Sequence, residues 1–161
     1  TTVESVTSAL KRARASLQTR LPSAAGEHAP QPGSPAENAI VQRFVTAYES
    51  ADVDALVALL TDDVFMAMPP MLCEYDGPEL VGRFFQPLFA RRARYHLVPT
   101  RANGQPAFGL YVSDTTGTRR ATGLSAVTLV GGRIRERRHF EASVLPLFGL
   151  PATLPPVGSR P

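Results

Sequence analysis

The residues best suited to chemistry stand together in the run Arg137-Arg138-His139-Phe140-Glu141. Side chains of a strand alternate between its two faces, so His139 and Glu141 would share one face with Arg137. If that face lines an interior, the imidazole and the carboxylate form a pair able to move a proton at a bound substrate. If it faces water, the same residues belong to a charged sheet surface. The sequence leaves both interpretations open.

Other candidates for acid–base or ligand chemistry are scattered along the chain. His96 lies in a second predicted strand, whereas Glu74 and Asp63 occupy positions typical of a loop and a cap. The histidines and Cys73 show no paired spacing that would hold a metal ion. No glycine-rich phosphate loop follows a strand, and no serine–histidine–aspartate signature is present. We therefore expect no metal and no cofactor.

Three turn signals delimit the strands that carry these residues. They are Asn103-Gly104, Asp114 to Gly117 and Gly131-Gly132, and the two dipeptides supply the positive φ angles that tight hairpins require. Period-two alternation between the signals predicts four consecutive antiparallel strands within Arg94 to Ser143. Their cores are Tyr95 to Val98, Phe108 to Val112, Leu124 to Val130 and Ile134 to Ser143.

The segment before these strands predicts three helices and one short strand. Ser34-Pro35-Ala36-Glu37 has the serine, proline and glutamate of a helix start. Asp52 caps a second helix expected to reach Leu60, and a strand from Val64 to Met68 follows. A third helix begins at Asp76 to Glu79, with Leu80, Val81, Phe84, Phe85 and Leu88 facing inward. The order predicts an α+β fold, with three helices packed on a curved, mainly antiparallel sheet.

The flanking segments have a different composition. Residues 1–21 read as a separate helix whose polar face carries Ser5, Ser8, Lys11 and Arg12. This face is either a solvated basic surface or a surface that contacts nucleic acid. Residues 22–35 form a Pro-rich, semi-rigid linker, and residues 36–143 the globular domain. The Pro-rich apolar tail, residues 144–161, is expected to lie along a groove of its own domain or of a partner.

Composition and charge narrow the setting. The formal charge is only +3, and Cys73 is the single cysteine, which favours a reducing, cytoplasmic location. No apolar run approaches the roughly 20 residues of a membrane helix, and no signal peptide pattern opens the chain. Because the chain starts at Thr1, without methionine and inside a predicted helix, we expect it to be part of a longer protein.

Two parts of the chain resemble known families. Phe44 to Glu49, Asp52 to Val64 and Tyr75-Asp76-Gly77 resemble the SnoaL-like domains of the nuclear-transport-factor-2-like superfamily, which have a cone-shaped α+β fold. Val3 to Leu17 resembles the last helix of region 4 in extracytoplasmic-function sigma factors, the recognition helix that reads promoter −35 DNA. Some sigma factors of this class carry a SnoaL-like domain after region 4. Val98 to Phe108 and Phe148 to Pro151 are similar to segments of that group.

The resemblance implies a regulatory protein. Its partners would be the RNA polymerase core and promoter −35 DNA, with Ser5, Ser8, Lys11 and Arg12 as DNA contacts. The SnoaL-like domain would act in cis on this engagement, and it could pair with a second copy through its sheet face. The alternatives are a small enzyme of the isomerase or cyclase type, with His139 and Glu141 as its weak catalytic candidates, or a ligand-sensing pocket. The cone interior implied by the resemblance is either a filled core or an apolar pocket, and large side chains would line it: Tyr48, Met66, Met68, Tyr75, Phe84, Phe108 and Tyr111.

Overall fold

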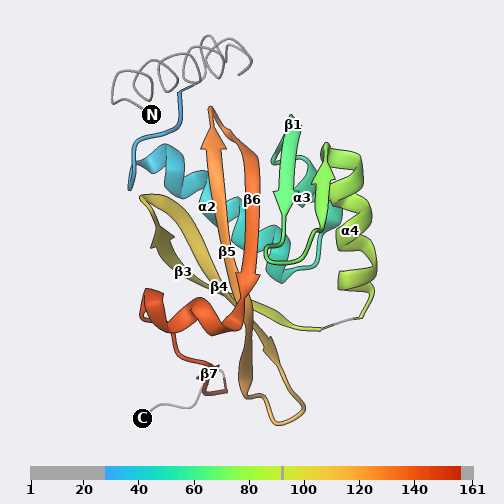
Figure 1. Cartoon of the computed structure of the whole chain (residues 1–161), viewed down its shortest axis with the longest axis vertical. Helices are drawn as coiled ribbons and strands as arrows, with labels where there is room; N and C mark the ends of the chain where they lie inside the picture. The colour runs from blue at the N-terminus through green and yellow to red at the C-terminus, as the bar shows by residue number, and fades with distance from the viewer. Residues whose placement is uncertain (1–27, 92, 157–161) are drawn as a thin grey trace, which may run out of the picture.

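The computed structural model of the chain describes residues 28–91 and 93–156 (Figure 1). The predicted helix 1–21, with Ser5, Ser8, Lys11 and Arg12, lies outside the described residues. No helix in the described part is long and apolar enough to cross a membrane. The helices are α2 (Pro35–Glu49), α3 (Val53–Val57), α4 (Pro78–Ala90) and the 3-10 helix η1 (Ala142–Phe148). The strands are β1 (Leu60–Ala67), β2 (Glu74–Asp76), β3 (Tyr95–Ala102), β4 (Gln105–Ser113), β5 (Arg119–Val130), β6 (Arg133–Glu141) and β7 (Thr153–Leu154).

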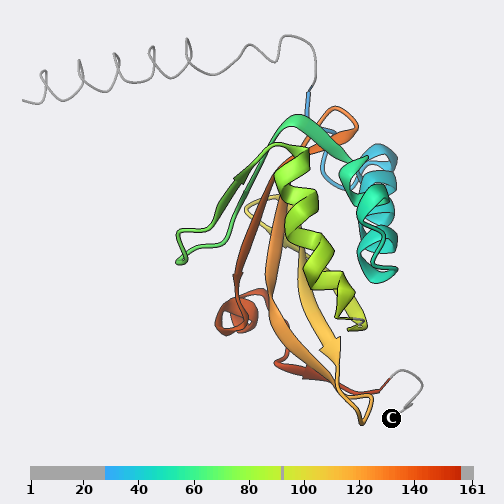
Figure 2. The ribbon, with the colours of Figure 1, turned by 90° about the vertical axis from the view of Figure 1, so that its right-hand side faces the viewer.

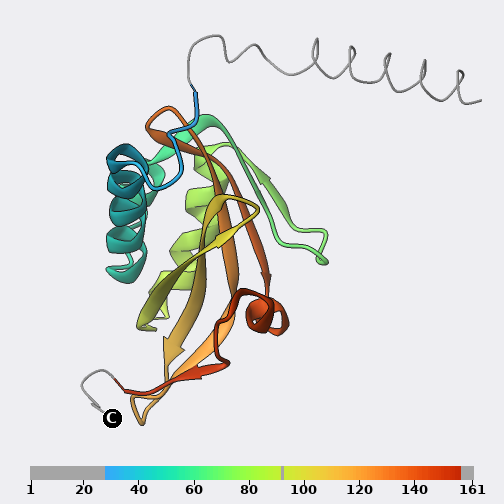
Figure 3. The same ribbon diagram turned by 90° about the vertical axis from the view of Figure 1, so that its left-hand side faces the viewer.

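One strongly curved sheet organises the fold. Its strand order is β2-β1-β6-β5-β4-β3, and β7 pairs with β5 outside this path. All pairings are antiparallel except the one between β1 and β6. Helices α2, α3 and α4 cover one face, while η1 lies on the other (Figures 2 and 3). The predicted α+β architecture, three helices against a curved and mainly antiparallel sheet, is confirmed.

The predicted start of α2 is correct, although its glutamate serves a different partner. The Ser34 hydroxyl accepts a hydrogen bond from the Glu37 backbone N–H at 3.2 Å. A capping box would return the Glu37 carboxylate to the N–H of Ser34. Instead it accepts from the N–H of Gly33 at 2.9 Å and from the Arg101 guanidinium at 2.8 and 3.0 Å. Glu37 thereby joins the linker, α2 and β3.

The three turn signals stand where the sequence predicts them. Asn103 and Gly104 connect β3 to β4 with φ angles of 50° and 79°, the combination that a two-residue hairpin of the primed type needs. Gly131 has a φ of 56° between β5 and β6, and Gly117 one of 82° between β4 and β5. These turns fix the antiparallel register of the last four long strands.

Two predicted boundaries and one predicted core residue are wrong. The second helix ends at Val57 and not near Leu60, because the Leu59 carbonyl accepts from the N–H of Ile134 at 2.8 Å and the chain enters β1 beside β6. The last long strand stops at Glu141, and the chain turns into η1. Leu80, expected to face inward, is 44% exposed, since Val81, Gly82, Phe85 and Phe89 form the buried face of α4.

The curved sheet buries apolar side chains on both faces. The larger cluster lies beneath the helices and includes Phe44, Tyr48, Phe85 and Phe108. The smaller cluster, centred on Tyr111, Leu124, Leu145 and Leu150, lies on the opposite face. The C-terminal segment supplies part of this second cluster, and the Tyr111 hydroxyl donates to the carbonyl of Pro151 at 2.8 Å. Residues 144–156 therefore pack on their own domain.

We expect Glu37→Gln to lower the free energy of unfolding by about 1–2 kcal/mol at neutral pH, because the Arg101 guanidinium loses the buried carboxylate that accepts its two hydrogen bonds. The Arg101 hydrogen bond holds the pKa of Glu37 below its ordinary value, with the Gly33 N–H acting in the same direction. The unfolded carboxyl therefore takes up a proton first as the pH falls, and stability falls with it below about pH 4.5.

Urea unfolding of the parent, Glu37→Gln and Glu79→Gln at pH 7 and pH 4 measures this difference. Glu79 is an exposed first-turn glutamate of α4, so its variant should stay within about 0.5 kcal/mol of the parent. Equal unfolding free energies for the two variants at pH 7 would show that the Glu37–Arg101 contact contributes nothing.

Candidate functional site

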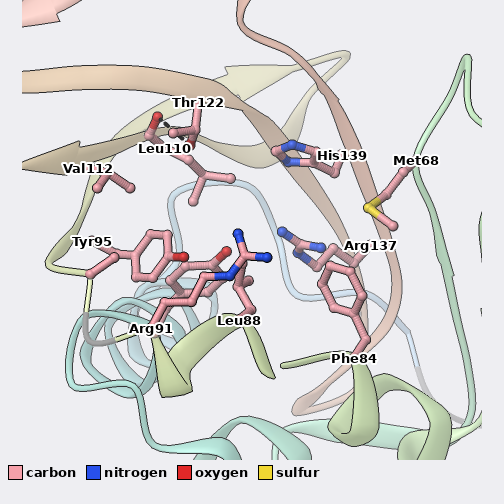
Figure 4. Close-up of a pocket in the computed structure, with 12 residues that line it drawn as sticks. Met68, Phe84, Leu88, Arg91, Tyr95, Leu110, Val112, Thr122, Arg137 and His139 are labelled. Carbon is pink, nitrogen blue, oxygen red and sulfur yellow. Dashed lines mark hydrogen bonds between the residues drawn. The ribbon is translucent and has the colours of Figure 1, made fainter. Parts of the chain in front are cut away.

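A hollow opens between α4 and the concave face of the sheet (Figure 4). Its volume is about 350 Å³, within the range of small-molecule pockets. Helices α2 and α4, the loops that follow β1 and α4, and strands β3 to β6 all contribute to its wall. The lining residues are Tyr48, Met68, Phe84, Leu88, Arg91, Ala93, Tyr95, Leu110, Val112, Thr122, Arg137 and His139.

Arg137 is the most buried charged group of the hollow. Arg137 belongs to β6, and its cross-strand neighbours are Val127 of β5 and Met66 of β1. Both neighbours are core residues, so the side chain of Arg137 lies on the face of the sheet that the helices cover. Only 4% of the residue is exposed. The guanidinium lies 5.3 Å from the Phe85 ring centroid and 5.8 Å from that of Tyr48.

The guanidinium has few hydrogen-bonding partners. Its Nη1 donates to the Met66 sulfur at 3.1 Å, and its Nε has no partner within the described residues. In the part of the chain that the structure describes, Arg137 forms no ion pair, whereas five other arginines do. Burial accordingly lowers the pKa of Arg137.

The contacts of Arg137 do not offset the free-energy cost of burying its charge. Taking an ion of this kind out of water costs several kcal/mol in real proteins. A desolvated cation–π contact returns about 2 kcal/mol, and a thioether is a weak acceptor. The two rings and the sulfur therefore compensate the charge of Arg137 only in part.

His139 follows two positions later on β6 and faces the same hollow. Gly123 of β5 leaves room for the ring, because a Cβ there would collide with the imidazole of His139 and the carbonyl of Phe140. Nδ1 of His139 is buried and has no hydrogen-bond partner among the residues described. Burial, and secondly the charge of Arg137, lowers the pKa of His139 to about 4. The imidazole is therefore neutral at physiological pH.

Orphaned polar atoms gather on this pair of strands. Four buried side-chain atoms lack a hydrogen-bond partner in the described segments. Three belong to Ser125, Arg137 and His139, and Ser125 is the cross-strand neighbour of His139. Such a concentration is unusual, because buried polar groups normally find partners.

Of the two interpretations of the run at residues 137–141, the His139–Glu141 pair inside the fold does not form. Glu141 is the last residue of β6 and is exposed, and the chain turns there into η1, so its carboxylate lies outside the hollow. The other acid–base candidates are also elsewhere. His96 contacts the Ser113 hydroxyl at 3.0 Å, Asp63 pairs with Arg135 at 3.1 Å, and Glu74 is exposed on β2.

Only some of the predicted lining residues line the hollow. Tyr48, Met68 and Phe84 line the hollow, and Met66 is fully buried beside Arg137. Phe108 fills the core against Phe44, with ring centroids 5.1 Å apart. Tyr75 packs on Phe84 at a neighbouring depression on the outer side of α4, which shares Phe84, Leu88 and Arg91 with the hollow.

Tyr111 is the clear error among these residues. It belongs to the second cluster, on the far face of the sheet. Strand alternation already opposes Tyr111 to Phe108 and Leu110, so the sequence held the signal. Sequence reasoning also missed Leu88, Arg91, Tyr95, Leu110, Val112 and Thr122 as lining residues. Thr122 lies at a bulge, where no residue of β4 stands opposite it in the register, and its hydroxyl donates to the carbonyl of Leu110 at 3.2 Å.

The chemistry of the hollow is that of a donor-rich site in apolar walls. Two guanidinium groups, those of Arg91 and Arg137, point into the space that His139 and Tyr95 also face (Figure 4). The wall contains no aspartate or glutamate. In residues 28–91 and 93–156, no three His, Cys, Asp or Glu side chains gather where a metal ion could bind. The site can hold negative charge, but it lacks a carboxylate base.

Comparisons with known proteins show which family the chain resembles. The model of the SnoaL-like domain family matches residues 41–137. The chain is 31% identical over 158 residues to the ECF RNA polymerase sigma factor SigG of Mycobacterium tuberculosis, strains H37Rv and CDC 1551. That match covers 96% of this chain and 42% of the relative, so the chain spans about two fifths of the length of the curated relatives it matches.

Solved structures share the fold at low sequence identity. A protein of unknown function with a cystatin-like fold from Methylobium petroleophilum matches with a TM-score of 0.55 and 15% identity, over 70% of this chain and 80% of its own. An LEH-like epoxide hydrolase of Mycobacterium tuberculosis matches with a TM-score of 0.50 and 18% identity, over 66% of this chain and 81% of its own. These likenesses establish the fold alone.

We expect the His139 imidazole to titrate with a pKa of about 4, and Arg137→Met to raise that pKa. The variant removes the repulsive charge but keeps the burial, which is the larger cause, so the new pKa should stay below the ordinary value. NMR of the histidine side chains against pH measures both. Arg138→Met is the matched control, because Arg138 is exposed and absent from the hollow's wall. A His139 pKa that does not respond to Arg137→Met would contradict the contact.

Proposed function

The chain is a member of the SnoaL-like domain family, and we propose that it is the C-terminal part of an extracytoplasmic-function sigma factor whose SnoaL-like domain regulates transcription initiation in cis. The observation that carries this proposal is the extent of the SigG match. It covers 96% of the chain and therefore runs far beyond the domain at residues 41–137. A shared domain alone would leave the segments on either side unmatched.

In this proposal the parts of the chain have separate tasks. Residues 1–21 are the last helix of region 4, where Ser5, Ser8, Lys11 and Arg12 contact promoter −35 DNA. Residues 22–35 are the linker, residues 36–143 the regulatory domain and residues 144–161 its tail. The RNA polymerase core is the protein partner of the whole factor, which acts in the cytoplasm.

Contacts at the end of the linker favour regulation in cis. The carbonyl of His28 accepts from the N–H of Gly131, in the β5–β6 turn, at 3.2 Å. The N–H of Gly33 donates to the Glu37 carboxylate at 2.9 Å. The linker therefore joins the domain at a defined place beside the sheet (Figure 1). A Pro-rich linker is semi-rigid, so a change in the domain can alter the position of what precedes the linker.

The composition of the hollow favours binding over catalysis. An isomerase or hydrolase needs a base within reach of its substrate. The wall has no carboxylate, and a histidine with a pKa of about 4 is a weak base at neutral pH. We therefore propose a regulatory domain without turnover. Consumption of a bound metabolite by the chain would instead support the enzyme alternative.

We expect removal of residues 36–161 to change promoter-specific transcription by the full-length factor. The assay is in vitro transcription with core RNA polymerase, comparing the complete factor with the truncated one on the same promoter. Glu37→Gln should move transcription in the same direction to a smaller extent, because it frees one linker contact. Glu79→Gln, matched in chemistry and remote from the linker, should behave as the parent. Identical transcription by complete and truncated factors would contradict regulation in cis.

We expect Lys11→Ala and Arg12→Ala in the full-length factor to weaken binding to promoter DNA. Each lost phosphate contact should reduce the slope of log affinity against log salt by about 1. Fluorescence anisotropy with a labelled −35 duplex at several salt concentrations measures the slope. An unchanged slope would place these residues on a solvated helix face.

The coding sequence upstream of Thr1 is a further check, since the proposal requires sigma region 2 there.

A further inference from the structure

The buried guanidinium of Arg137 has no counter-charge that the domain supplies. It is 4% exposed, forms no ion pair in the described parts of the chain and leaves its Nε without a partner. Its remaining contacts are two aromatic rings and the Met66 sulfur. Burying an incompletely paired guanidinium costs free energy. A ligand in the hollow that Arg137 lines would give its unpartnered donor an acceptor.

The donors around that space come from β6, from β3 and from the end of α4, and they converge. Nδ1 of His139 is also buried and unpartnered, and the side chains of Arg91 and Tyr95 reach the same hollow from the opposite wall (Figure 4). The lining includes two permanent positive charges and no negative one. The formal charge that lines the hollow is therefore only positive, and its buried part is Arg137.

The rest of the wall is apolar. Met68, Phe84, Leu88, Ala93, Leu110 and Val112 surround the donors. A volume of about 350 Å³ is at the small end of the range of small-molecule pockets. A ligand complementary to this wall is apolar along most of its length and negatively charged at one end.

We propose that this hollow is a binding site for a small apolar carboxylic acid, with the carboxylate paired to Arg137 and its aliphatic or aromatic body against Phe84, Leu88 and Leu110. The planar fork of a guanidinium matches a carboxylate in a bidentate pair. Arg91, which is exposed at the rim, assists from the entrance. A phosphate group is a poorer match, because its larger charge and additional acceptors would face apolar side chains. The proposal stands independently of the sigma-factor role.

Binding to the chain of residues 1–161 tests the proposal, with octanoate and phenylacetate as probes and octanamide and phenylacetamide as their neutral counterparts. Isothermal titration calorimetry at pH 7 should give saturable binding of at least one acid with a Kd below about 1 mM. The matching amide should bind at least about tenfold more weakly, because it brings no charge to the guanidinium. Since this comparison uses the unaltered chain, it does not depend on the folding of any variant.

Variants locate the contact. Arg137→Met keeps the apolar stem and should weaken acid binding at least about tenfold, while Arg137→Lys should restore only part of it, since it keeps the charge and loses the fork. Arg138→Met is the control on the same strand and should leave the Kd within about twofold, as an exposed residue outside the site. In the parent, the Nε–H resonance of Arg137 should shift on addition of the acid.

Three results would overturn the proposal. Amides that bind as tightly as the acids would show a purely apolar hollow. Acid binding that survives Arg137→Met unchanged would place the anion elsewhere. Absence of saturable binding by both acids would overturn it as well, and a loss of stability in Arg137→Met would then make Arg137 a structural cation held by the rings of Tyr48 and Phe85.

Discussion

The character of the domain's interior is set by a positive charge held inside it. Arg137 stands on β6, between the parallel pairing to β1 and the antiparallel pairing to β5. The side chain extends under the aromatic rings that α2 and α4 contribute. Tyr48 meets Phe85, Phe89 and Tyr95 edge to face at 5.3 to 5.6 Å, so the rings form a rigid wall. A collapsed apolar core would exclude the guanidinium, and its presence keeps one end of the interior polar and open.

The two faces of the sheet pack against different parts of the chain. The concave face carries the helices, the main core and the hollow, while the opposite face is partly covered by η1 and β7. The linker enters beside the β5–β6 turn, and β6 carries Arg137 and His139 directly beyond that turn. One strand therefore connects the linker attachment to the base of the hollow. This continuity gives a physical route by which occupancy of the hollow could bias what the linker carries.

Local signals in the sequence predicted much of the fold. Ser34-Pro35 at the start of α2, the Asn103-Gly104 turn and the alternation of β4 each depend on neighbouring residues alone, and each is present in the structure. The parallel pairing of β1 with β6 could not be read in the same way, because it joins Leu60 to Ile134 across the whole domain. That pairing shortened α3 and extended β1 beyond the predicted limits.

The site was predictable only in part. Alternation placed Arg137 and His139 on one face, and the structure brings both to the hollow. It could not reveal that β6 ends at Glu141, which removes the carboxylate from the expected pair. Arg91 and Tyr95 reach the hollow through the packing of α4 on the sheet, a long-range property with no local signature. Tyr111 was predicted to line the interior, although the alternation of its strand places it on the face opposite to Phe108 and Leu110.

A crystal structure of the chain grown with octanoate tests the account of the interior most directly. The expected result is density for a carboxylate within hydrogen-bond distance of the Arg137 guanidinium, with the alkyl chain between α4 and the sheet. A hollow filled by water, with Arg137 turned out to solvent or paired to a carboxylate of the protein, would contradict it.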